Sequence, residues 1–217
     1  MANDLKTGVC FASAGSGYDD LTSSISGVIS MNGEPGATLR LSPSRMIYRP
    51  GVRAVKAANN VYIRELYELG CRGIIASGLP PIGCLPIQMT AKSPLHRICL
   101  EKENSDSQIY NQKLQKLLPN LQAQHPGSKI LYADIYTPIS DLINNPHEYG
   151  FEEIKKGCCG TGLLEAGPLC TTKSPMCTDT SQYIFFDSIH PTESTYYHIT
   201  EYLVKELLPK FSTVDSF

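Results

Sequence analysis

The sequence predicts an α/β protein in which helices cover both faces of a mostly parallel sheet. Short apolar runs rich in β-branched residues are typical of buried strands, and amphipathic helical stretches alternate with them. This alternation favours parallel strands joined by helical connections. The length of 217 residues suits one such domain, so we treat residues 1–217 as a single domain.

Four segments have the composition of strands, because each is short and rich in apolar, β-branched or aromatic residues. Helical patterns lie between them, as parallel pairing requires. The four segments are Gly8–Ala12 (GVCFA), Gly73–Ser77 (GIIAS), Lys129–Tyr136 (KILYADIY) and Tyr183–Phe186 (YIFF).

Two helices are predicted between these strands. The first covers Val61–Leu69, and Gly70 is well suited to end it. The second runs from Arg97 to Gln124, with Pro119 as a point where it is expected to kink. We expect the buried face of this second helix to consist of Ile109, Leu114, Leu117 and Leu121.

A final helix is predicted after Pro191, near the C-terminus of the chain. Thr192 is placed to be its N-cap, because a threonine hydroxyl can accept a hydrogen bond from the first free backbone N–H groups. Its apolar residues recur at helical spacing, which predicts a buried stripe of Tyr196, Ile199, Leu203 and Leu207.

Residues 31–60 do not fit the α/β pattern. This segment holds several prolines and glycines together with four arginines, and it shows neither strand nor helix periodicity. A connection of this length without secondary structure is unusual inside a compact domain. We therefore regard residues 31–60 as an irregular, atypical insert.

Charge and hydropathy exclude several classes of protein. The net charge of −2 provides no global field for binding nucleic acid. The chain has no apolar run long enough to be a transmembrane segment. Its first ten residues, MANDLKTGVC, lack the basic and apolar regions of a secretory signal peptide.

The cysteines point to an oxidising compartment. There are eight of them, and their even number and local clustering suggest disulfides. A zinc site is the alternative, but the chain offers no C-x-x-C pair with an adjacent histidine to support it. The local cluster consists of Cys158, Cys159, Cys170 and Cys177.

The stretch FFDSIHPTE contains two of the groups that a serine hydrolase needs. Asp187 and His190 are three residues apart, so a short turn can place both side chains on one side of the backbone. Asp187 could then hold the imidazole in the tautomer that leaves its other nitrogen free to accept a proton. The alternative is a carboxylate that caps the next helix beside a half-exposed histidine.

Taken together, the motifs are specific. The order FASAGSGYD, ELYELGCRGIIASGLPPIGCLP, NQKLQKLLP, KILYADIY, YGFEEIKKGCCGTG and FFDSIHPTE resembles the plant GDSL esterase/lipase family of the SGNH hydrolase superfamily. The resemblance covers residues 5–30 and about 61–210. It implies a flavodoxin-like α/β/α sandwich, a secreted location, and hydrolysis of small-molecule or lipid esters without a metal or an organic cofactor.

The resemblance also implies roles for particular residues. His190 matches the general base, Asp187 its orienting carboxylate, and Gly15 the block whose backbone N–H serves the oxyanion hole. The disulfides of the family would be formed, in pairs that the sequence leaves open, by Cys84, Cys99, Cys158, Cys159, Cys170 and Cys177.

Two blocks of the family have no match in the 217 residues. One is the Gly-Asp-Ser block at the end of the first strand, which carries the nucleophile, and the other is the G-x-N-D block that follows the third strand. We therefore expect a truncated or internally deleted member that lacks the first and third strands and is inactive by itself. The alternative is a degenerate member that acts as a binding protein or has no function.

Overall fold

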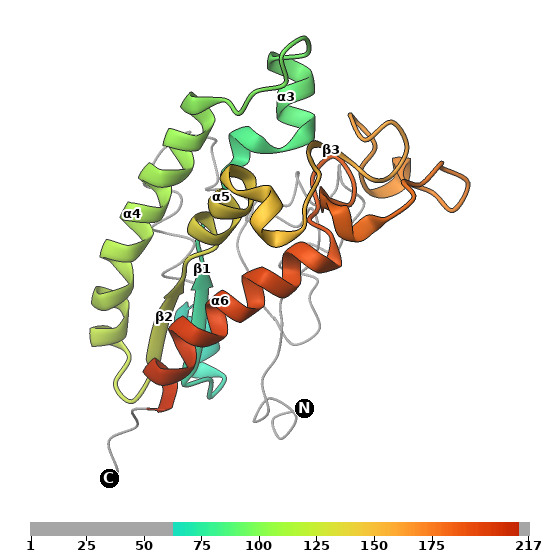
Figure 1. Cartoon of the computed structure of the whole chain (residues 1–217). Coiled ribbons are helices and arrows are strands. Elements are labelled where there is room, and N and C mark those ends of the chain that lie inside the picture. Colours follow the sequence, from blue (N-terminus) through green and yellow to red (C-terminus); the bar gives the residue numbers. More distant parts are fainter. Residues whose placement is uncertain (1–62, 213–217) are drawn as a thin grey trace. The chain divides into compact units, whose positions relative to one another are not determined.

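The computed structural model describes residues 63–212 (Figure 1). Strands and helices follow one another along this range, which confirms the predicted α/β class. A short helix over residues 63–68 comes first. The main elements after it are β1 (Gly73–Ser77), α3 (Pro86–Lys92), α4 (Glu101–Gln124), β2 (Lys129–Ala133), α5 (Tyr136–Asn144), β3 (Glu153–Gly157), β4 (Tyr183–Phe185) and α6 (Glu193–Ser212).

The described strands form two small sheets. β1 is hydrogen-bonded to β2, and β3 runs parallel to β4. The β3–β4 register pairs Glu153 with Tyr183 and Gly157 with Phe185, with an irregularity between the two pairs. The expected strand Gly8–Ala12 and the insert over residues 31–60 lie outside the described residues.

The chain divides into two compact units. Of the described residues, one unit holds 63–74 and 119–130, and the other holds 75–118 and 131–212. In the first unit, the helix over 63–68 ends at Gly70, which has a left-handed φ of 97°. The N–H groups of Gly70 and Cys71 donate to carbonyl oxygens of that helix at 3.0 and 2.9 Å. This Schellman arrangement confirms the predicted helix end.

The larger unit has an apolar core between α5, β4 and α6. α6 packs against both α5 and β4, and α3 packs against β3 (Figure 1). Phe151 is fully buried in this core, as is Ile184 of β4. The buried members of the core are Cys84, Ile139, Leu142, Ile143, Phe151, Ile184, Phe185 and Ile199.

α4 begins later than predicted and buries a different face. Arg97, its predicted start, has a left-handed φ of 48°, and the helix begins only at Glu101. Ile109 is 44% exposed, so its predicted burial is wrong, and Leu117 is only half-buried. The face that is buried consists of Ser107, Asn111, Leu114, Leu118 and Leu121.

The polar residues on this face of α4 have a physical reason to be buried. The Asn111 side chain accepts a hydrogen bond from Leu79 N at 2.7 Å and donates one to Leu79 O at 2.9 Å. Asn104 similarly accepts from Gly83 N at 2.8 Å. The two asparagines thus satisfy backbone groups of the proline-rich turn between β1 and α3, which apolar side chains could not do.

The strand Lys129–Tyr136 is shorter than predicted, and α5 was not predicted. β2 ends at Ala133, and the Asp134 side chain bonds the first turn of the following helix, whose N-cap is Ile135. The Asp134 Oδ1 atom accepts hydrogen bonds from the backbone N–H groups of Tyr136 and Thr137 at 3.0 and 3.1 Å. The side chain therefore stabilises the start of α5 where the apolar pattern suggested a continuing strand.

α6 begins as predicted, but its buried stripe differs from the predicted one, and Leu203 is only half-buried. Thr192 Oγ1 accepts a hydrogen bond from Thr195 N at 3.3 Å, which confirms Thr192 as the N-cap. Ile199 and Leu207 are buried as predicted, whereas Tyr196 is 49% exposed and that prediction is wrong. Thr195 is fully buried instead, because its hydroxyl donates to a carbonyl oxygen of β4 at 2.8 Å.

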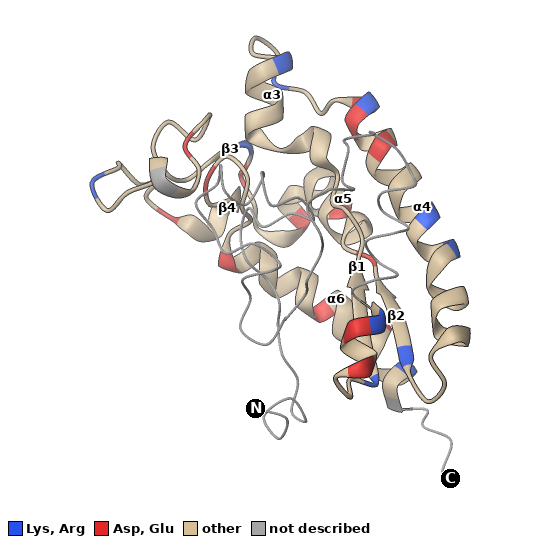
Figure 2. Ribbon diagram, turned by 180° about the vertical axis from the view of Figure 1, so that it is seen from behind, with Lys and Arg blue, Asp and Glu red and all other residues tan. Residues whose placement is uncertain are grey.

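Acidic and basic side chains are interspersed on the helices. Figure 2 shows residues of both signs of charge along α4. Such mixing cancels the field beyond a short distance. Of the helices within residues 63–212, none combines the length and the apolar character needed to cross a bilayer.

Candidate functional site

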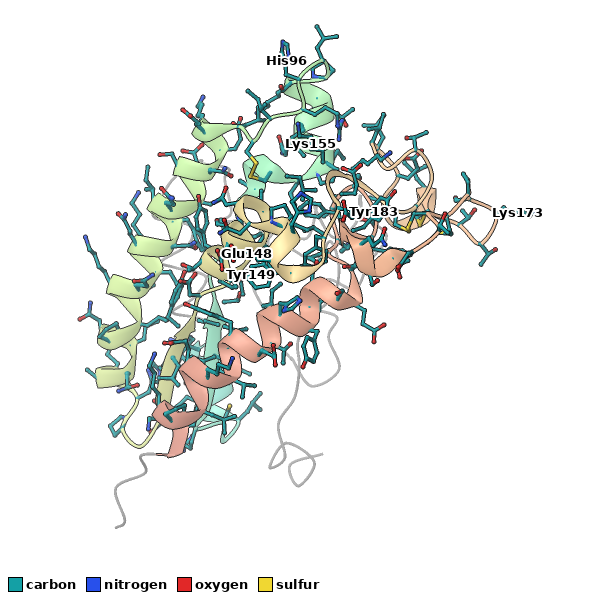
Figure 3. All side chains as sticks on the ribbon, in the orientation of Figure 1. His96, Glu148, Tyr149, Lys155, Lys173 and Tyr183 are labelled. Atoms are coloured by element: carbon teal, nitrogen blue, oxygen red, sulfur yellow. A yellow bond between two sulfur atoms is a disulfide. The ribbon has the colours of Figure 1, made fainter. Side chains whose placement is uncertain are left out.

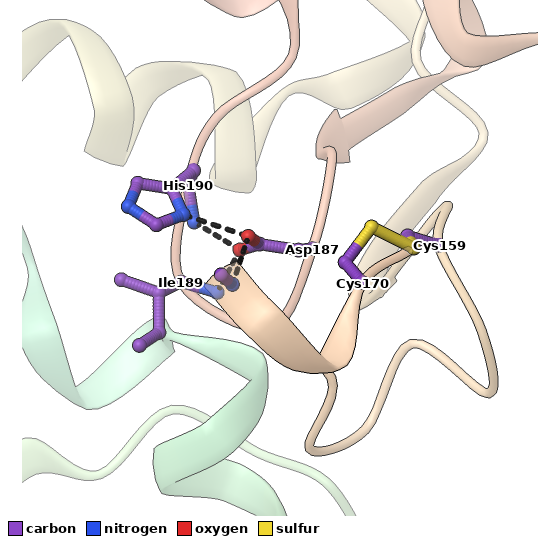
Figure 4. A network of polar contacts seen from close by, with 6 residues as sticks. Cys159, Cys170, Asp187, Ile189 and His190 are labelled. Atoms are coloured by element: carbon purple, nitrogen blue, oxygen red, sulfur yellow. Dashed lines mark hydrogen bonds and ion pairs between the residues drawn. A yellow bond between two sulfur atoms is a disulfide. The ribbon is translucent and has the colours of Figure 1, made fainter. Parts of the chain in front are cut away.

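A tight turn after β4 carries Asp187 and His190. Phe186 N donates to His190 O at 2.8 Å, which closes the turn. The structure thereby brings the two predicted side chains together, with His190 Nδ1 2.7 Å from Asp187 Oδ2 (Figure 4). We call Asp187 and His190 the dyad from here on.

The Asp187 carboxylate is buried but well supplied with donors. Its side chain is 5% exposed. Oδ1 accepts hydrogen bonds from Ile189 N and His190 N at 2.8 and 2.7 Å, and Oδ2 accepts a longer one from Gly167 N at 3.4 Å. A buried carboxylate needs such partners to remain charged. These bonds fix its orientation.

The His190 ring is the accessible member of the dyad. Its side chain is 38% exposed, and only Nδ1 contacts Asp187. In Figure 4 the far side of the ring points away from the carboxylate. An ionised Asp187 favours the tautomer with the proton on Nδ1, which leaves Nε2 as a proton acceptor. The arrangement can therefore act as an oriented general base.

All six cysteines predicted to form disulfides are paired, and the sulfur atoms that a zinc site would need are bonded to one another. The bonds are Cys84–Cys99, Cys158–Cys177 and Cys159–Cys170. Two of them cross-link residues 158–177, which we call the disulfide loop. Figure 4 shows the Cys159–Cys170 bond near Asp187, and Figure 3 shows Lys173 at the outer end of this loop.

α3 supports the dyad turn from another side. Ile87 N donates to Ser188 O at 3.0 Å, which ties α3 to the residue after Asp187. Thr90 Oγ1 donates to Leu163 O of the disulfide loop at 2.9 Å. Arg97 donates in turn to Thr90 Oγ1 at 2.8 Å. One backbone bond thus joins α3 to the dyad turn, and a side-chain bond joins α3 to the disulfide loop.

The end of β3 approaches the Asp187 backbone closely. A Cβ atom added to Gly157 would lie 2.5 Å from the backbone C and O atoms of Asp187. That is far inside van der Waals contact, so only glycine fits at this position without a shift of the dyad turn. Gly157 was not among the residues singled out from the sequence.

Gly157→Ala is expected to lower the free energy of unfolding by about 2 kcal/mol, because the new methyl group overpacks against backbone that cannot move aside. The displaced turn should also lower the fraction of His190 in the Nδ1–H tautomer. Urea denaturation measures the first effect, and ¹⁵N NMR of the imidazole measures the second.

Gly150→Ala is the control for this prediction. Gly150 has a left-handed φ of 81°, but an added Cβ would meet nothing within 4 Å. Backbone strain alone should cost about 1 kcal/mol there and leave the His190 tautomer unchanged. If Gly157→Ala also left the tautomer unchanged, the close approach to Asp187 would not matter for the dyad.

Within the described residues, no serine near the dyad in sequence is placed as its nucleophile. Ser188 lies in the dyad turn, but it is fully buried and its Oγ has no hydrogen-bond partner among residues 63–212. It therefore does not donate to His190. Ser13, Ser16 and the predicted oxyanion residue Gly15 lie outside the described residues. Residues 63–212 also hold no His, Cys, Asp and Glu cluster arranged as metal ligands.

Two other residues around the dyad were missed by sequence reasoning. Glu165 and Gly167 lie in the stretch GCCGTGLLEAG of the disulfide loop, and both contact the dyad turn through backbone atoms. The many glycines in that stretch could have indicated that its backbone lies close to another part of the chain. The sequence does not show that this other part is the dyad turn.

The fold and the dyad together describe an α/β protein with a carboxylate–imidazole pair after a strand. Residues 51–203 match the family described as GDSL-like Lipase/Acylhydrolase. The chain belongs to this family, as the sequence resemblance indicated.

Several curated relatives come from Arabidopsis thaliana. The GDSL esterase/lipase At2g31550 is 44% identical over 236 residues, which cover 89% of this chain and 65% of the relative. At1g58430 is 43% identical over 241 residues, and At2g40250 is 41% identical over 251 residues, covering 95% of this chain and 70% of the relative. The chain thus spans 65% of the length of the first of these relatives.

Proposed function

We propose that this chain carries the general-base part of a carboxylic ester hydrolase site. The observation that carries the proposal is the 2.7 Å contact between His190 Nδ1 and the buried Asp187 carboxylate. Membership of the GDSL-like family supports an ester as the substrate. The substrate class is therefore a small-molecule or lipid ester.

In this mechanism His190 acts through its exposed nitrogen. Asp187 holds the proton on Nδ1, so Nε2 accepts the proton of an attacking hydroxyl group. The buried carboxylate then stabilises the imidazolium that forms, and His190 returns the proton to the leaving alcohol. Backbone N–H groups near Gly15 are proposed to bind the oxyanion. Each step of this mechanism is carried out by a group of the protein, so the proposed mechanism needs no cofactor.

We propose that the nucleophile of this reaction is not among these 217 residues. They contain no Gly-Asp-Ser and no G-x-N-D sequence. The alignment with At2g31550 supports an internal deletion: 89% of 217 residues is about 193, so about 43 of the 236 aligned positions hold no residue of this chain. Residues 31–60 are proposed to stand where the G-x-N-D block lies in the family.

A fluorophosphonate probe tests this part of the proposal, because it bonds covalently to serines that a neighbouring base has activated. The 217-residue polypeptide is expected to remain unlabelled and to hydrolyse a short-chain chromogenic ester no faster than its His190→Ala variant. An active serine hydrolase treated in parallel controls for probe quality. Labelling of any serine of this chain that His190→Ala prevents would show that the nucleophile is present after all.

We also propose that the protein folds in an oxidising compartment, as a secreted family member would. Three disulfides support this, since disulfides persist in secreted proteins and are rare in the cytosol. The bonds Cys158–Cys177 and Cys159–Cys170 link adjacent cysteines to two different partners, which is a structural framework and not a reactive pair.

A further inference from the structure

One carboxylate organises the part of the disulfide loop that contacts the dyad. Glu165 Oε1 accepts hydrogen bonds from Thr161 N at 3.0 Å and Thr161 Oγ1 at 2.9 Å. Oε2 accepts from Leu163 N at 3.2 Å and Leu164 N at 3.3 Å. A carboxylate that accepts from three backbone N–H groups in this way fixes the path of residues 161–165.

The same residue is joined to the dyad turn through its backbone. Glu165 O accepts a hydrogen bond from Ser188 N at 2.8 Å, immediately after Asp187. Two residues further along the loop, Gly167 N donates to Asp187 Oδ2, the oxygen that also contacts His190. The loop therefore adds a donor to Oδ2, beside the two donors that the dyad turn itself supplies to Oδ1.

We propose that Glu165 is a positioning residue for the dyad: its carboxylate shapes the loop that supplies Asp187 with the Gly167 N–H and holds Ser188, and so keeps the His190 imidazole in its Nδ1–H tautomer. The proposal deepens the proposed function and rests on it only for the catalytic role of the dyad. Glu165 itself does not touch the reacting atoms.

The charge of Glu165 is part of this role. Hydrogen bonds from Thr161 N, from its own backbone and from the Thr161 hydroxyl lower the pKa of the Glu165 carboxyl from its ordinary value of 4.5 to about 2. The carboxylate is thus stabilised by the folded loop. Its contribution to stability is present above about pH 4.5 and is lost as the pH falls toward 2.

Glutamine cannot replace this carboxylate, although it has nearly the same shape. Oε1 can still accept from Thr161, but the second oxygen becomes an NH₂ group, which would face the Leu163 and Leu164 N–H donors. Donors facing donors leave the half-buried Leu163 N–H without its partner, and the exposed Leu164 N–H then has only water to bond to. Glu165→Gln should therefore loosen the loop without changing the size of the side chain.

The experiment measures the two neutral tautomers of His190 by ¹⁵N NMR of the 217-residue chain at a pH where the ring is neutral. In the wild type we expect almost only the Nδ1–H tautomer. In Glu165→Gln the ratio of Nδ1–H to Nε2–H should fall about 10-fold, which corresponds to about 1.4 kcal/mol of lost differential stabilisation. Circular dichroism establishes that the fold is kept.

Asp179→Asn is the matched control. Asp179 also carries a hydrogen-bonded carboxylate with a lowered pKa, caused by the Ser181 hydroxyl and then the Ser181 N–H. Within the described residues its carboxylate bonds only within its own turn, so its loss should leave the His190 tautomer ratio as in the wild type. Thr161→Val removes one donor from Glu165 and should lower the ratio by a smaller factor.

If Glu165→Gln does not fold, Thr161→Val decides the question. The proposal would be overturned if the folded variant, Glu165→Gln or Thr161→Val, kept the wild-type ratio of His190 tautomers. It would also be overturned if Asp179→Asn lowered this ratio as much as Glu165→Gln does. The measurement needs no ester turnover. An inactive chain in the fluorophosphonate test therefore leaves this proposal standing, and a wild-type ratio leaves the proposed ester hydrolysis standing.

Discussion

His190→Ala is expected to abolish ester hydrolysis in a version of this chain to which the Gly-Asp-Ser and G-x-N-D blocks of the family have been restored. The loss in kcat should be about 10⁶-fold, the size found when the base of a serine protease triad is removed. The physical reason is that a serine hydroxyl without an oriented base is a poor nucleophile at neutral pH. Turnover of a short-chain chromogenic ester measures the effect.

His147→Ala is the control for this result. The His147 side chain is 76% exposed and lies outside the dyad turn, so its replacement should leave kcat unchanged. A restored chain whose activity survived His190→Ala would contradict the general-base role of His190. A restored chain that folds, binds the fluorophosphonate probe and loses the labelling with His190→Ala would support it independently.

Removing the Cys158–Cys177 disulfide by a double replacement with alanine is expected to lower the free energy of unfolding by about 3 kcal/mol, because the bond closes a loop of intermediate length in the unfolded chain. The sequence separation of the two cysteines is 19. Because this bond frames the loop that supplies Gly167 N to Asp187, the His190 tautomer ratio should fall as well. Denaturant unfolding and ¹⁵N NMR measure the two effects.

The Cys84–Cys99 bond provides a matched comparison. Its sequence separation is 15, so removing it should cost nearly the same stability. It encloses α3, which bonds Ser188 O through Ile87 N but supplies no donor to the Asp187 carboxylate, so its loss should change the tautomer ratio less. Equal falls in the ratio for both disulfides would mean that the dyad responds to overall stability and not to the loop.

Local chemistry was sufficient to predict much of the fold. The strands at Gly73–Ser77 and Tyr183–Phe185, the helix end at Gly70 and the N-cap at Thr192 were all readable, because each depends on residues close in sequence. α5 and the true start of α4 were not. Asp134 and Arg97 decide those boundaries through side-chain bonds and backbone conformation that override the apolar pattern.

The buried faces of the long helices show where sequence reasoning stops. Burial was predicted for Ile109 and Tyr196 because both are large and apolar, but the positions next to the core belong to Asn111 and Thr195. Those two side chains are buried because backbone groups of a turn and of β4 need their hydrogen bonds. Which backbone groups will lack partners depends on the tertiary structure.

The family, the α/β class and the two residues of the dyad could be predicted from the amino-acid sequence, because Asp187 and His190 lie within one turn and need no distant partner. What holds that turn in place was visible only in the folded protein. Gly157 of β3 lies close to the Asp187 backbone, and Glu165 and Gly167 of the disulfide loop are hydrogen-bonded to the dyad turn. Contacts of that kind are set by packing in three dimensions, which spacing along one chain does not encode.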